Sequence, residues 1–559
     1  MPSPVGDPSV TKRASQSPKL KPVGLVPRGR VSQRRILLVL AGAVFLVHAS
    51  WVGTWLVDDT GISLAYARNL ASGHGLRSQP GAPAVEGFSN PLWTLLIAPL
   101  TVLPPPVLAP AVKLLSLMLV LACFGLLVES SGNRVADAWA PIWIALSPSF
   151  VIWTTSGLEN PLFALLGVAS ILVMEKAVGG VPPPVVSVAA GLVAAGLALT
   201  RPDGLAYAAL FAGGLARHAW RSADRLPAAR AAVLHATAFA AVFGGYLFFR
   251  WRYFGDFVPN TYRAKFVSSL VDHDPRRVVD LVGSVAGPLA LPLVAALVVA
   301  VLFLAFRRGL TPRSWALGSH LAVAAAVYVV LPPDWMGEHR FATLFVVCFW
   351  WMLFAVWEDC RTLASETPSA RPFGVLSAGA LIALAWSAGS TTERSRDFAL
   401  NPIVPLERIH RFGRAYESLA HSVAEPSLLA PDLGGLLLAA DRLRVFDLAG
   451  LCDKEIARTL MRDPRGFHDY VFERLRPSFI HAHGAWADWA SLHSDPRFER
   501  DYVPLHEIWQ PAGQPPISGE EHAEPLSGDY VRRSAVPAPG GIAALRAEFR
   551  KLRLDEFLP

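Results

Sequence analysis

The chain has 559 residues, of which 52% are hydrophobic and only 17% are charged. Soluble proteins carry about 25% charged residues, so this composition excludes an ordinary soluble protein and indicates a chain that crosses a membrane several times. The formal charge of +7 does not indicate nucleic-acid binding, because the basic residues lie beside apolar runs rather than on a face interleaved with aromatic residues.

Residues 1–35 are basic and rich in Pro and Ser, so they are predicted to form a disordered tail in the cytoplasm. The apolar run 36–57 that follows is long enough to cross a bilayer, and it ends among Trp51 and Trp55 without a small-residue cleavage site. We interpret it as an uncleaved first helix that leads outward.

Ten further apolar runs predict, with the first helix, about eleven crossings of an α-helical membrane domain over residues 36–390. The runs lie near 91–109, 111–128, 135–152, 158–176, 185–216, 231–250, 286–306, 314–332, 340–357 and 374–390. Between residues 110 and 216 prolines interrupt the pattern, and the direction of each crossing stays open there.

Arginine clusters set the expected orientation. The clusters at 217–230, 307–313 and 361–371 are predicted to be cytoplasmic, since short cytoplasmic loops carry an excess of positive charge. Segments 251–285 and 333–339 then lie outside, together with the loop after the first helix and everything after residue 390.

Residues 391–559 have ordinary polarity and contain 25 of the 44 acidic residues. They predict a soluble α/β domain on the extracytoplasmic face. The four cysteines are far apart and show no disulfide or metal spacing. His481, His483 and His493 have no acidic or cysteine partner at ligand spacing, so no metal site is predicted in this domain.

The first outer loop, 58–90, begins with the adjacent acids Asp58 and Asp59. An acid within hydrocarbon is unfavourable by roughly 2.5–3.5 kcal/mol, so a pair at the membrane boundary indicates a function. Apolar residues recur at helical spacing from Ile62 to Leu70, which predicts an amphipathic helix along the membrane surface. At its N-terminus the helix dipole favours the ionised form that a general base or metal ligand needs. The alternative is helix capping, which needs only one Asp.

An ordered set of short motifs runs from this loop into the soluble domain. Together the motifs resemble the arabinogalactan terminal β-(1→2)-arabinofuranosyltransferases and their bacterial relatives, which are C-type (GT-C) membrane glycosyltransferases. Each motif alone is weak, whereas their order along most of the chain is specific. They are Asp58-Asp59, Ala67-Arg68-Asn69-Leu70, Gly73-His74-Gly75-Leu76, Glu86 to Trp93, Ser156-Gly157-Leu158-Glu159, Thr200-Arg201-Pro202-Asp203-Gly204, Tyr253-Phe254-Gly255-Asp256, Pro259-Asn260-Thr261-Tyr262 with Lys265, Asp334-Trp335-Met336 with Arg340-Phe341, and Asp447-Leu448-Ala449-Gly450-Leu451.

The resemblance implies an enzyme of the bacterial inner membrane that moves a sugar from a polyprenyl-phosphate donor to a glycan or glycolipid acceptor outside the cytoplasm. Asp58 or Asp59 would be the general base, with Asp58 the first choice. Lys265, Arg340 and Arg201 would bind the donor phosphate, although each could instead be a positive charge that reaches the lipid headgroups. The acidic pair could also hold Mg²⁺ or Mn²⁺, but one base suffices for this chemistry.

Further residues of these motifs are expected to bind the sugar or the acceptor. Polar side chains bind hydroxyl groups, the ring of Trp93 could stack on a sugar face, and Glu159 is an acid in apolar surroundings. Two alternatives stay open: Asn90 before a proline also suits a helix start, and His339 could be a turn residue. The full set is Glu86, Asn90, Trp93, Glu159, Asn260, Tyr262, Asp334 and His339.

The first loop departs from its relatives at Thr60-Gly61 and at Gln79-Pro80-Gly81, so the transferred sugar stays open, with arabinofuranose one candidate. A transporter or flippase for lipid-linked saccharide is the alternative from another class, because it too needs many helices and buried charges. A non-catalytic scaffold is a third. The absence of a visible inverted repeat and the long loop with paired acids favour the enzyme; the oligomeric state is not determined by the sequence.

Overall fold

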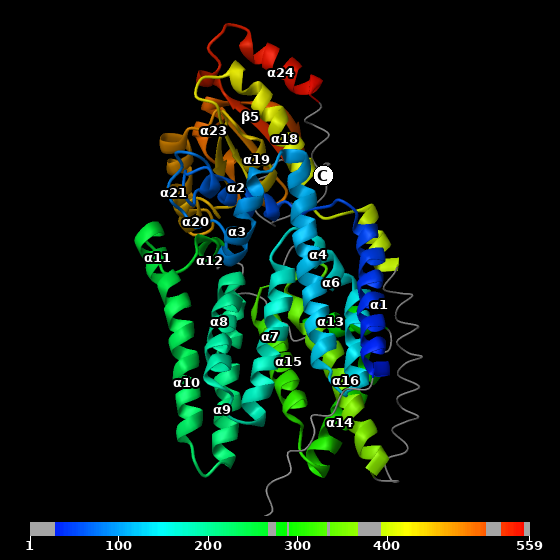
Figure 1. The fold of residues 1–559 in the computed structure, drawn as a ribbon. Helices are drawn as coiled ribbons and strands as arrows, with labels where there is room; N and C mark the ends of the chain where they lie inside the picture. The colour runs from blue at the N-terminus through cyan, green and yellow to red at the C-terminus, as the bar shows by residue number, and fades with distance from the viewer. Residues whose placement is uncertain are drawn as a thin grey trace, which may run out of the picture.

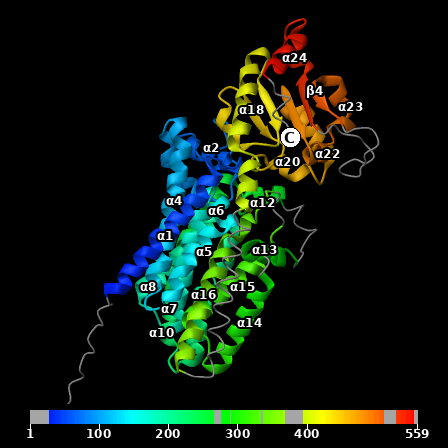
Figure 2. The same cartoon turned by 90° about the vertical axis from the view of Figure 1, so that its right-hand side faces the viewer.

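The computed structural model describes residues 28–265, 276–287, 290–332, 336–366, 393–509 and 527–552. Figures 1 and 2 show two parts: a bundle of long helices, and a smaller α/β domain that stands at one end of the bundle. The chain passes from the bundle into the domain through residues 401–405.

The bundle is formed by apolar segments whose backbone groups are satisfied within each helix, as a lipid environment requires. Six segments of the described chain are long and apolar enough to cross a membrane, or seven if the pair α5 (Ala140–Leu146) and α6 (Pro148–Thr155), bent by 69°, counts as one. The long helices are α1 (Arg28–Val52), α4 (Pro105–Ser130), α7 (Asn160–Gly179), α8 (Pro184–Thr200), α9 (Leu210–Arg221), α10 (Leu226–Phe239) continuing through η4 (Ala240–Gly244) into α11 (Gly245–Phe254), α14 (Ala290–Arg307), α15 (Pro312–Val330) and α16 (Thr343–Glu366).

Length and hydropathy thus give fewer spans than the eleven that the apolar runs predict. The reason is local, because several runs are divided into shorter helices. The run near 91–109 becomes α3 (Pro91–Ile97) and the 3-10 turn η1 (Ala98–Val102) before α4 begins. The run near 185–216 becomes α8 and α9, separated by the 3-10 turn η3 (Pro202–Tyr207). The predicted crossing at 374–390 lies outside the described residues.

The helix expected after the acidic pair is present as α2 (Asp59–Ala71), but it does not lie open on a membrane surface. Nine of its thirteen residues are buried. It packs against α3 on the side of the bundle and against α19 (Gly434–Ala439) of the α/β domain. The α/β domain covers the side of α2 that faces away from the bundle. Helix α2 therefore joins the two parts of the molecule.

The described part of the α/β domain contains a five-stranded sheet in the order β2-β1-β3-β5-β4. Strand β1 pairs in parallel with β2 and β3, whereas β5 pairs antiparallel with β3 and β4. The strands are β1 (Ser427–Ala430), β2 (Arg444–Asp447), β3 (Phe479–His483), β4 (Tyr502–Ile508) and β5 (Ser527–Arg532); the flanking helices include α18 (Leu406–Leu419), α20 (Lys454–Thr459), α21 (Pro464–Asp469), α22 (Ala485–Ala490), α23 (Pro496–Asp501) and α24 (Gly541–Lys551). The carboxyl ends of the parallel strands carry Asp447 and His483.

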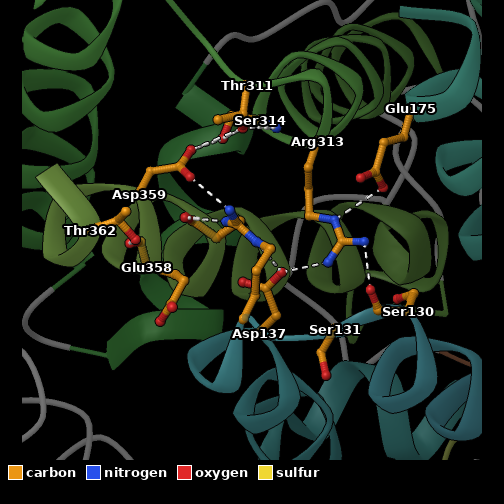
Figure 3. A network of polar contacts seen from close by, with 12 residues as sticks. Ser130, Ser131, Asp137, Glu175, Thr311, Arg313, Ser314, Glu358, Asp359 and Thr362 are labelled. Carbon is orange, nitrogen blue, oxygen red and sulfur yellow. Dashed lines mark hydrogen bonds and ion pairs between the residues drawn. The ribbon is translucent and has the colours of Figure 1, made fainter. Parts of the chain in front are cut away.

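Where α15 begins, a network of ion pairs joins four helical elements, which are η2 (Val135–Trp139), α7, α15 and α16 (Figure 3). Arg313, at the start of α15, binds Asp137 at 2.6 Å and Glu175 at 3.0 Å. Arg134 binds the same Asp137 at 2.9 Å and also Asp359 of α16 at 2.7 Å. Asp137 is fully buried, so the two guanidinium groups are the compensation that a charged carboxylate needs in this interior.

Removal of the central carboxylate is expected to destabilise the bundle strongly. Asp137→Ala leaves Arg313 and Arg134 without their shared partner, and breaking a buried pair in this way is worth roughly 3–5 kcal/mol. The measurement is the thermal midpoint of the purified protein in detergent. The control is Arg361→Gln, because the side chain of Arg361 is 61% exposed in its pair with Glu358 and such a pair contributes about 0–1 kcal/mol. Equal shifts for the two variants would contradict the expectation.

Candidate active site

Asp58 is held by the α/β domain through its backbone and its side chain. Its N–H donates to the carbonyl of Val404 at 3.1 Å, beside a β-bridge between Val57 and Pro405. Its two carboxylate oxygens accept from the N–H groups of Gly434 at 2.9 Å and Gly435 at 2.7 Å. Although Asp58 precedes α2, its side chain does not cap that helix; it binds the first N–H groups of α19 instead.

The two glycines are needed for this contact. A Cβ on Gly434 would lie 1.8 Å from the carbonyl oxygen of Asp58, and one on Gly435 would lie 2.3 Å from the backbone nitrogen of His410. Burial raises the pKa of the Asp58 carboxyl well above its usual range, the charge of Asp432 adds to this, and the two N–H donors oppose it. The Asp58 carboxyl is therefore a buried contact between the first loop and the α/β domain.

Asp58→Ala is expected to loosen the contact between the two parts of the molecule. The variant leaves two buried N–H donors without an acceptor, which costs roughly 1–3 kcal/mol per donor. We expect faster hydrogen exchange of the amides at 434–439 and in α2, measured by mass spectrometry. Asp469→Ala is the control, since that side chain is 58% exposed. Unchanged exchange in Asp58→Ala would show that other contacts dominate the docking.

Asp59 has a different environment. Its Oδ2 pairs with Nη1 of Arg340 at 3.2 Å, and its side chain is 24% exposed while that of Arg340 is 9% exposed. The guanidinium of Arg340 lies 5.8 Å from the ring centres of both Trp153 and Phe341. The aromatic rings orient the guanidinium, and the carboxylate is the more exposed member of the pair.

The backbone before Arg340 is unusual. Gly337, Glu338 and His339 all have positive φ, at 64°, 44° and 51°. Non-glycine residues in this region are strained, and consecutive ones persist only where the surroundings hold them. Here the carbonyl of Glu338 accepts from Nε1 of Trp153 at 2.9 Å, and Nδ1 of His339 is 2.7 Å from the hydroxyl of Tyr328. The strained segment sets the direction in which Arg340 leaves the chain.

A second polar chain lies beside Phe341. Nδ2 of Asn90 donates to Glu159 at 2.8 Å, and the other oxygen of Glu159 pairs with Arg201 at 3.0 Å. Arg201 also pairs with Asp203 at 3.0 Å and lies 4.8 Å from the ring centre of Phe341. Phe341 thus lies near both Arg201 and Arg340, and Arg201 pairs with Asp203 as well as with Glu159.

The other predicted residues lie in different surroundings. Glu86 is buried and pairs with Arg250 at 2.6 Å, and Trp93 is fully buried with its Nε1 donating to the carbonyl of Gly157. His339 is partly buried, and burial lowers its pKa to about 4, with Arg394 and Arg277 adding to the shift.

Three of the predicted residues belong to one short helix that follows α11. On α12 (Asn260–Lys265), Tyr262 is 55% exposed and Lys265 is exposed. Asn260, at the start of this helix, is buried and donates to the carbonyls of Gly450 and Leu451 in the α/β domain. Asp334 lies outside the described residues.

No protein-family model and no curated protein matches this chain. Solved structures match it in fold. ArnT from Cupriavidus metallidurans bound to undecaprenyl phosphate is 12% identical, with a TM-score of 0.54 over 92% of this chain and 100% of that one. The archaeal oligosaccharyltransferase AglB from Archaeoglobus fulgidus, in complex with an inhibitory peptide and a dolichol-phosphate, is 12% identical, with a TM-score of 0.50 over 92% of this chain and 75% of that one. The chain has a GT-C fold.

The GT-C fold expected from the ordered motifs is thereby confirmed. The arabinofuranosyltransferase AftD from mycobacteria also matches, at 17% identity and a TM-score of 0.46, over 90% of this chain and 40% of that one. A likeness of this size says nothing about which sugar this GT-C chain uses.

The acidic pair of this GT-C chain does not converge on one point. Asp58 faces the N–H groups of Gly434 and Gly435, while Asp59 faces Arg340. In the described ranges, no group of three or more His, Cys, Asp and Glu side chains has an arrangement that could hold a metal ion. Binding of Mg²⁺ or Mn²⁺ by the acidic pair stays a prediction, with the two carboxylates directed at different partners.

Sequence reasoning missed acidic partners for the histidines of the α/β domain. His483 lies 2.9 Å from Asp432, and His481 lies 2.9 Å from Asp529. These partners are about fifty residues away in the chain, which is why ligand spacing did not reveal them. The available signal was topological: Asp432 follows β1 and His483 ends β3, and parallel strands bring such residues to one edge of a sheet.

The end of β2 carries a carboxyl group that should titrate near neutral pH. Burial raises the pKa of Asp447 to about 7, and the charge of Asp453 adds to the shift, whereas the N–H of Cys452, at 2.6 Å, opposes it. The unfolded carboxyl has a pKa of about 3.9. Between these values the folded domain keeps a proton that the unfolded chain has lost, so this contribution to stability is complete below pH ~4 and decreases as pH rises through about 7.

Asp447→Asn should remove this decrease. We expect the difference between the thermal midpoints, variant minus wild type, to be larger at pH 8 than at pH 5. The reason is that the amide stays neutral and its oxygen can still accept from the N–H of Cys452. Asp469→Asn, at an exposed position, is the control and should show no such trend. A constant difference between Asp447→Asn and the wild type across this range would contradict a raised pKa.

Proposed function

We propose that this chain is a membrane glycosyltransferase that moves a sugar from a polyprenyl-phosphate donor to a hydroxyl group of a cell-envelope glycan or lipid. The observation that carries the proposal is the partly exposed pair of Asp59 and Arg340 where the bundle meets the α/β domain. The GT-C fold supports it, as do the lipid phosphates bound to ArnT and AglB.

In the proposed reaction the Asp59 carboxylate accepts the proton of the acceptor hydroxyl. The hydroxyl oxygen forms a bond to the anomeric carbon of the donor sugar, and the bond from that carbon to the phosphate oxygen breaks. The phosphate leaves with the electron pair. A base within hydrogen-bond reach contributes typically 10²–10⁴-fold to such a step.

The leaving phosphate needs nearby positive charge. Arg340 is the first candidate, because a guanidinium has five N–H donors and can bind a phosphate oxygen while another donor serves Asp59. Lys265, exposed on α12, is the second candidate. Arg201 already pairs with Glu159 and Asp203, so we assign to it the positioning of Glu159 and Asn90 rather than phosphate binding.

The orientation follows from the charges at the two ends of the bundle. The end of α14, the start of α15 and the end of α16 lie away from the α/β domain (Figure 1). These helix ends carry or adjoin Arg308, Arg313 and Arg361, and the positive-inside bias assigns such a basic end to the cytoplasm. The proposed site then faces outward from the bacterial inner membrane. Arabinofuranose is the first sugar to test.

The deciding experiment uses the purified chain in lipid vesicles that contain a radiolabelled polyprenyl-phosphate sugar, with envelope glycan fragments added outside. Donors that carry arabinofuranose and other pentoses and hexoses are compared. We expect labelled glycan to form with at least one donor and to disappear with Asp59→Asn. Movement of the labelled lipid between leaflets without transfer would overturn the proposal in favour of a flippase.

A further inference from the structure

A cavity of about 690 Å³ lies between the first loop and the α/β domain. One wall is the loop segment 78–85. The facing wall comprises residues 440–447, and Asp453 to Glu455 with Tyr470 and Arg474 also contribute to the lining. A volume of this size is typical of sites for small ligands.

The loop wall is fastened to the domain by a specific contact. Strand β2 is at the edge of the sheet, so one side of its backbone has no neighbouring strand. The side chain of Gln79 takes that place: its Nε2 donates to the carbonyl of Leu443 at 3.1 Å, and its Oε1 accepts from the N–H of Val445 at 2.9 Å. Gln79 is buried, so the cavity is a built feature with a fixed wall.

The charges that line the cavity are balanced. Among the described residues, four acidic and four basic side chains contribute to its lining. Arg444 lies 5.1 Å from the ring centre of Phe446, and Arg474 lies 5.2 Å from that of Tyr470, so the rings orient guanidinium groups. A strongly anionic ligand would meet carboxylates as well as guanidinium groups, whereas hydroxyl groups can donate to the carboxylates and accept from the guanidinium groups.

The cavity is also linked to the candidate active site. Leu433 and Leu437 of the α19 region belong to its lining, and the N–H groups of Gly434 and Gly435 at the start of the same helix bind Asp58. The loop wall continues the chain that leaves α2. The cavity and the residue next to Asp59 thus contact the same helix.

We propose that this cavity binds a neutral, polyhydroxylated acceptor glycan and thereby selects the acceptor, at contacts separate from the Asp59–Arg340 pair. This inference rests on the proposed transferase function and adds the chemical class of the acceptor. Binding energy gained at such contacts positions the reacting hydroxyl without direct involvement in bond making.

The test compares two double variants of the full chain. Arg444→Ala with Arg474→Ala removes two exposed cavity cations, whereas Arg411→Ala with Arg465→Ala removes two exposed cations outside the lining. Binding to the detergent-solubilised protein is measured by calorimetry with a neutral arabinan hexasaccharide, a neutral galactan hexasaccharide and a uronic-acid hexasaccharide. We expect a neutral oligosaccharide to bind, and the cavity variant to weaken it roughly tenfold or more through loss of charge-assisted hydrogen bonds.

The outcomes separate this inference from the proposed function. Three outcomes would each overturn the cavity assignment. They are binding of neither neutral oligosaccharide, tighter binding of the uronic-acid oligomer than of the neutral ones, and equal weakening of binding by both double variants. If the wild type binds a neutral oligosaccharide in an Arg444- and Arg474-dependent way but transfers no sugar, the cavity assignment stands and the transferase fails. If transfer occurs and the cavity variant leaves the acceptor KM unchanged, the transferase stands and the cavity assignment fails.

Discussion

Asp59→Asn is expected to lower the rate of sugar transfer by roughly 10²–10⁴-fold, because the amide cannot accept the proton of the acceptor hydroxyl. The KM for the donor should change little, since the proposed phosphate contacts lie on Arg340 and Lys265. The measurement is initial transfer rate per folded enzyme, with the donor and the acceptor varied separately. Asp469→Asn, at an exposed site in the α/β domain, should keep the wild-type rate.

The matched comparison is Asp58→Asn. The Asp58 carboxyl is occupied by two backbone N–H groups and is buried, so its neutral isostere should reduce the stability of domain docking more than the rate per folded molecule. Sequence resemblance favours Asp58 as the base, whereas the geometry favours Asp59. Loss of transfer in Asp58→Asn together with a normal rate in Asp59→Asn would reverse this assignment.

Arg340→Gln is expected to lower kcat by roughly 10²–10³-fold, the range seen when one preorganised donor to a developing negative charge is removed. The donor KM should rise as well, since the guanidinium would bind the phosphate before and during its departure. Arg340→Lys should recover part of the rate, because it restores a point charge without the paired N–H geometry. Arg263→Gln removes a partly exposed guanidinium that pairs with Asp256 and serves as the control.

A double-variant cycle distinguishes a catalytic role of Arg340 from simple orientation of Asp59. If the two residues act as one unit, the effects of Asp59→Asn and Arg340→Gln will be strongly non-additive. A donor KM that stays at the wild-type value in Arg340→Gln would contradict phosphate binding. In that outcome Arg340 would be a positioning residue for Asp59.

Several features could be predicted from the sequence because their signals are local. The apolar runs and the sparse charge predict a helical bundle, and the apolar spacing from Ile62 to Leu70 predicts a helix where α2 is found. The number of crossings is less predictable, because hydropathy does not reveal where prolines and short turns divide a run, as between α8 and α9.

The partners of the candidate site residues carry no such local signal. Asp58 and Asp59 are chemically identical neighbours, yet one binds Gly434 and Gly435 while the other binds Arg340. These contacts join positions hundreds of residues apart. The direction of each carboxylate depends on how α2 is packed between the bundle and α19. The spacing of residues along the chain does not reveal this packing.

The amino-acid sequence by itself determined that this chain is a helical membrane protein with a polar C-terminal part and an acidic pair after its first apolar run. The tertiary structure alone decided the surroundings of each acid: Asp58 is buried against the α/β domain, and Asp59 remains partly exposed beside Arg340. The physical reason is that apolarity and helical periodicity are properties of neighbouring residues, whereas burial and ion pairing depend on residues that only folding brings together.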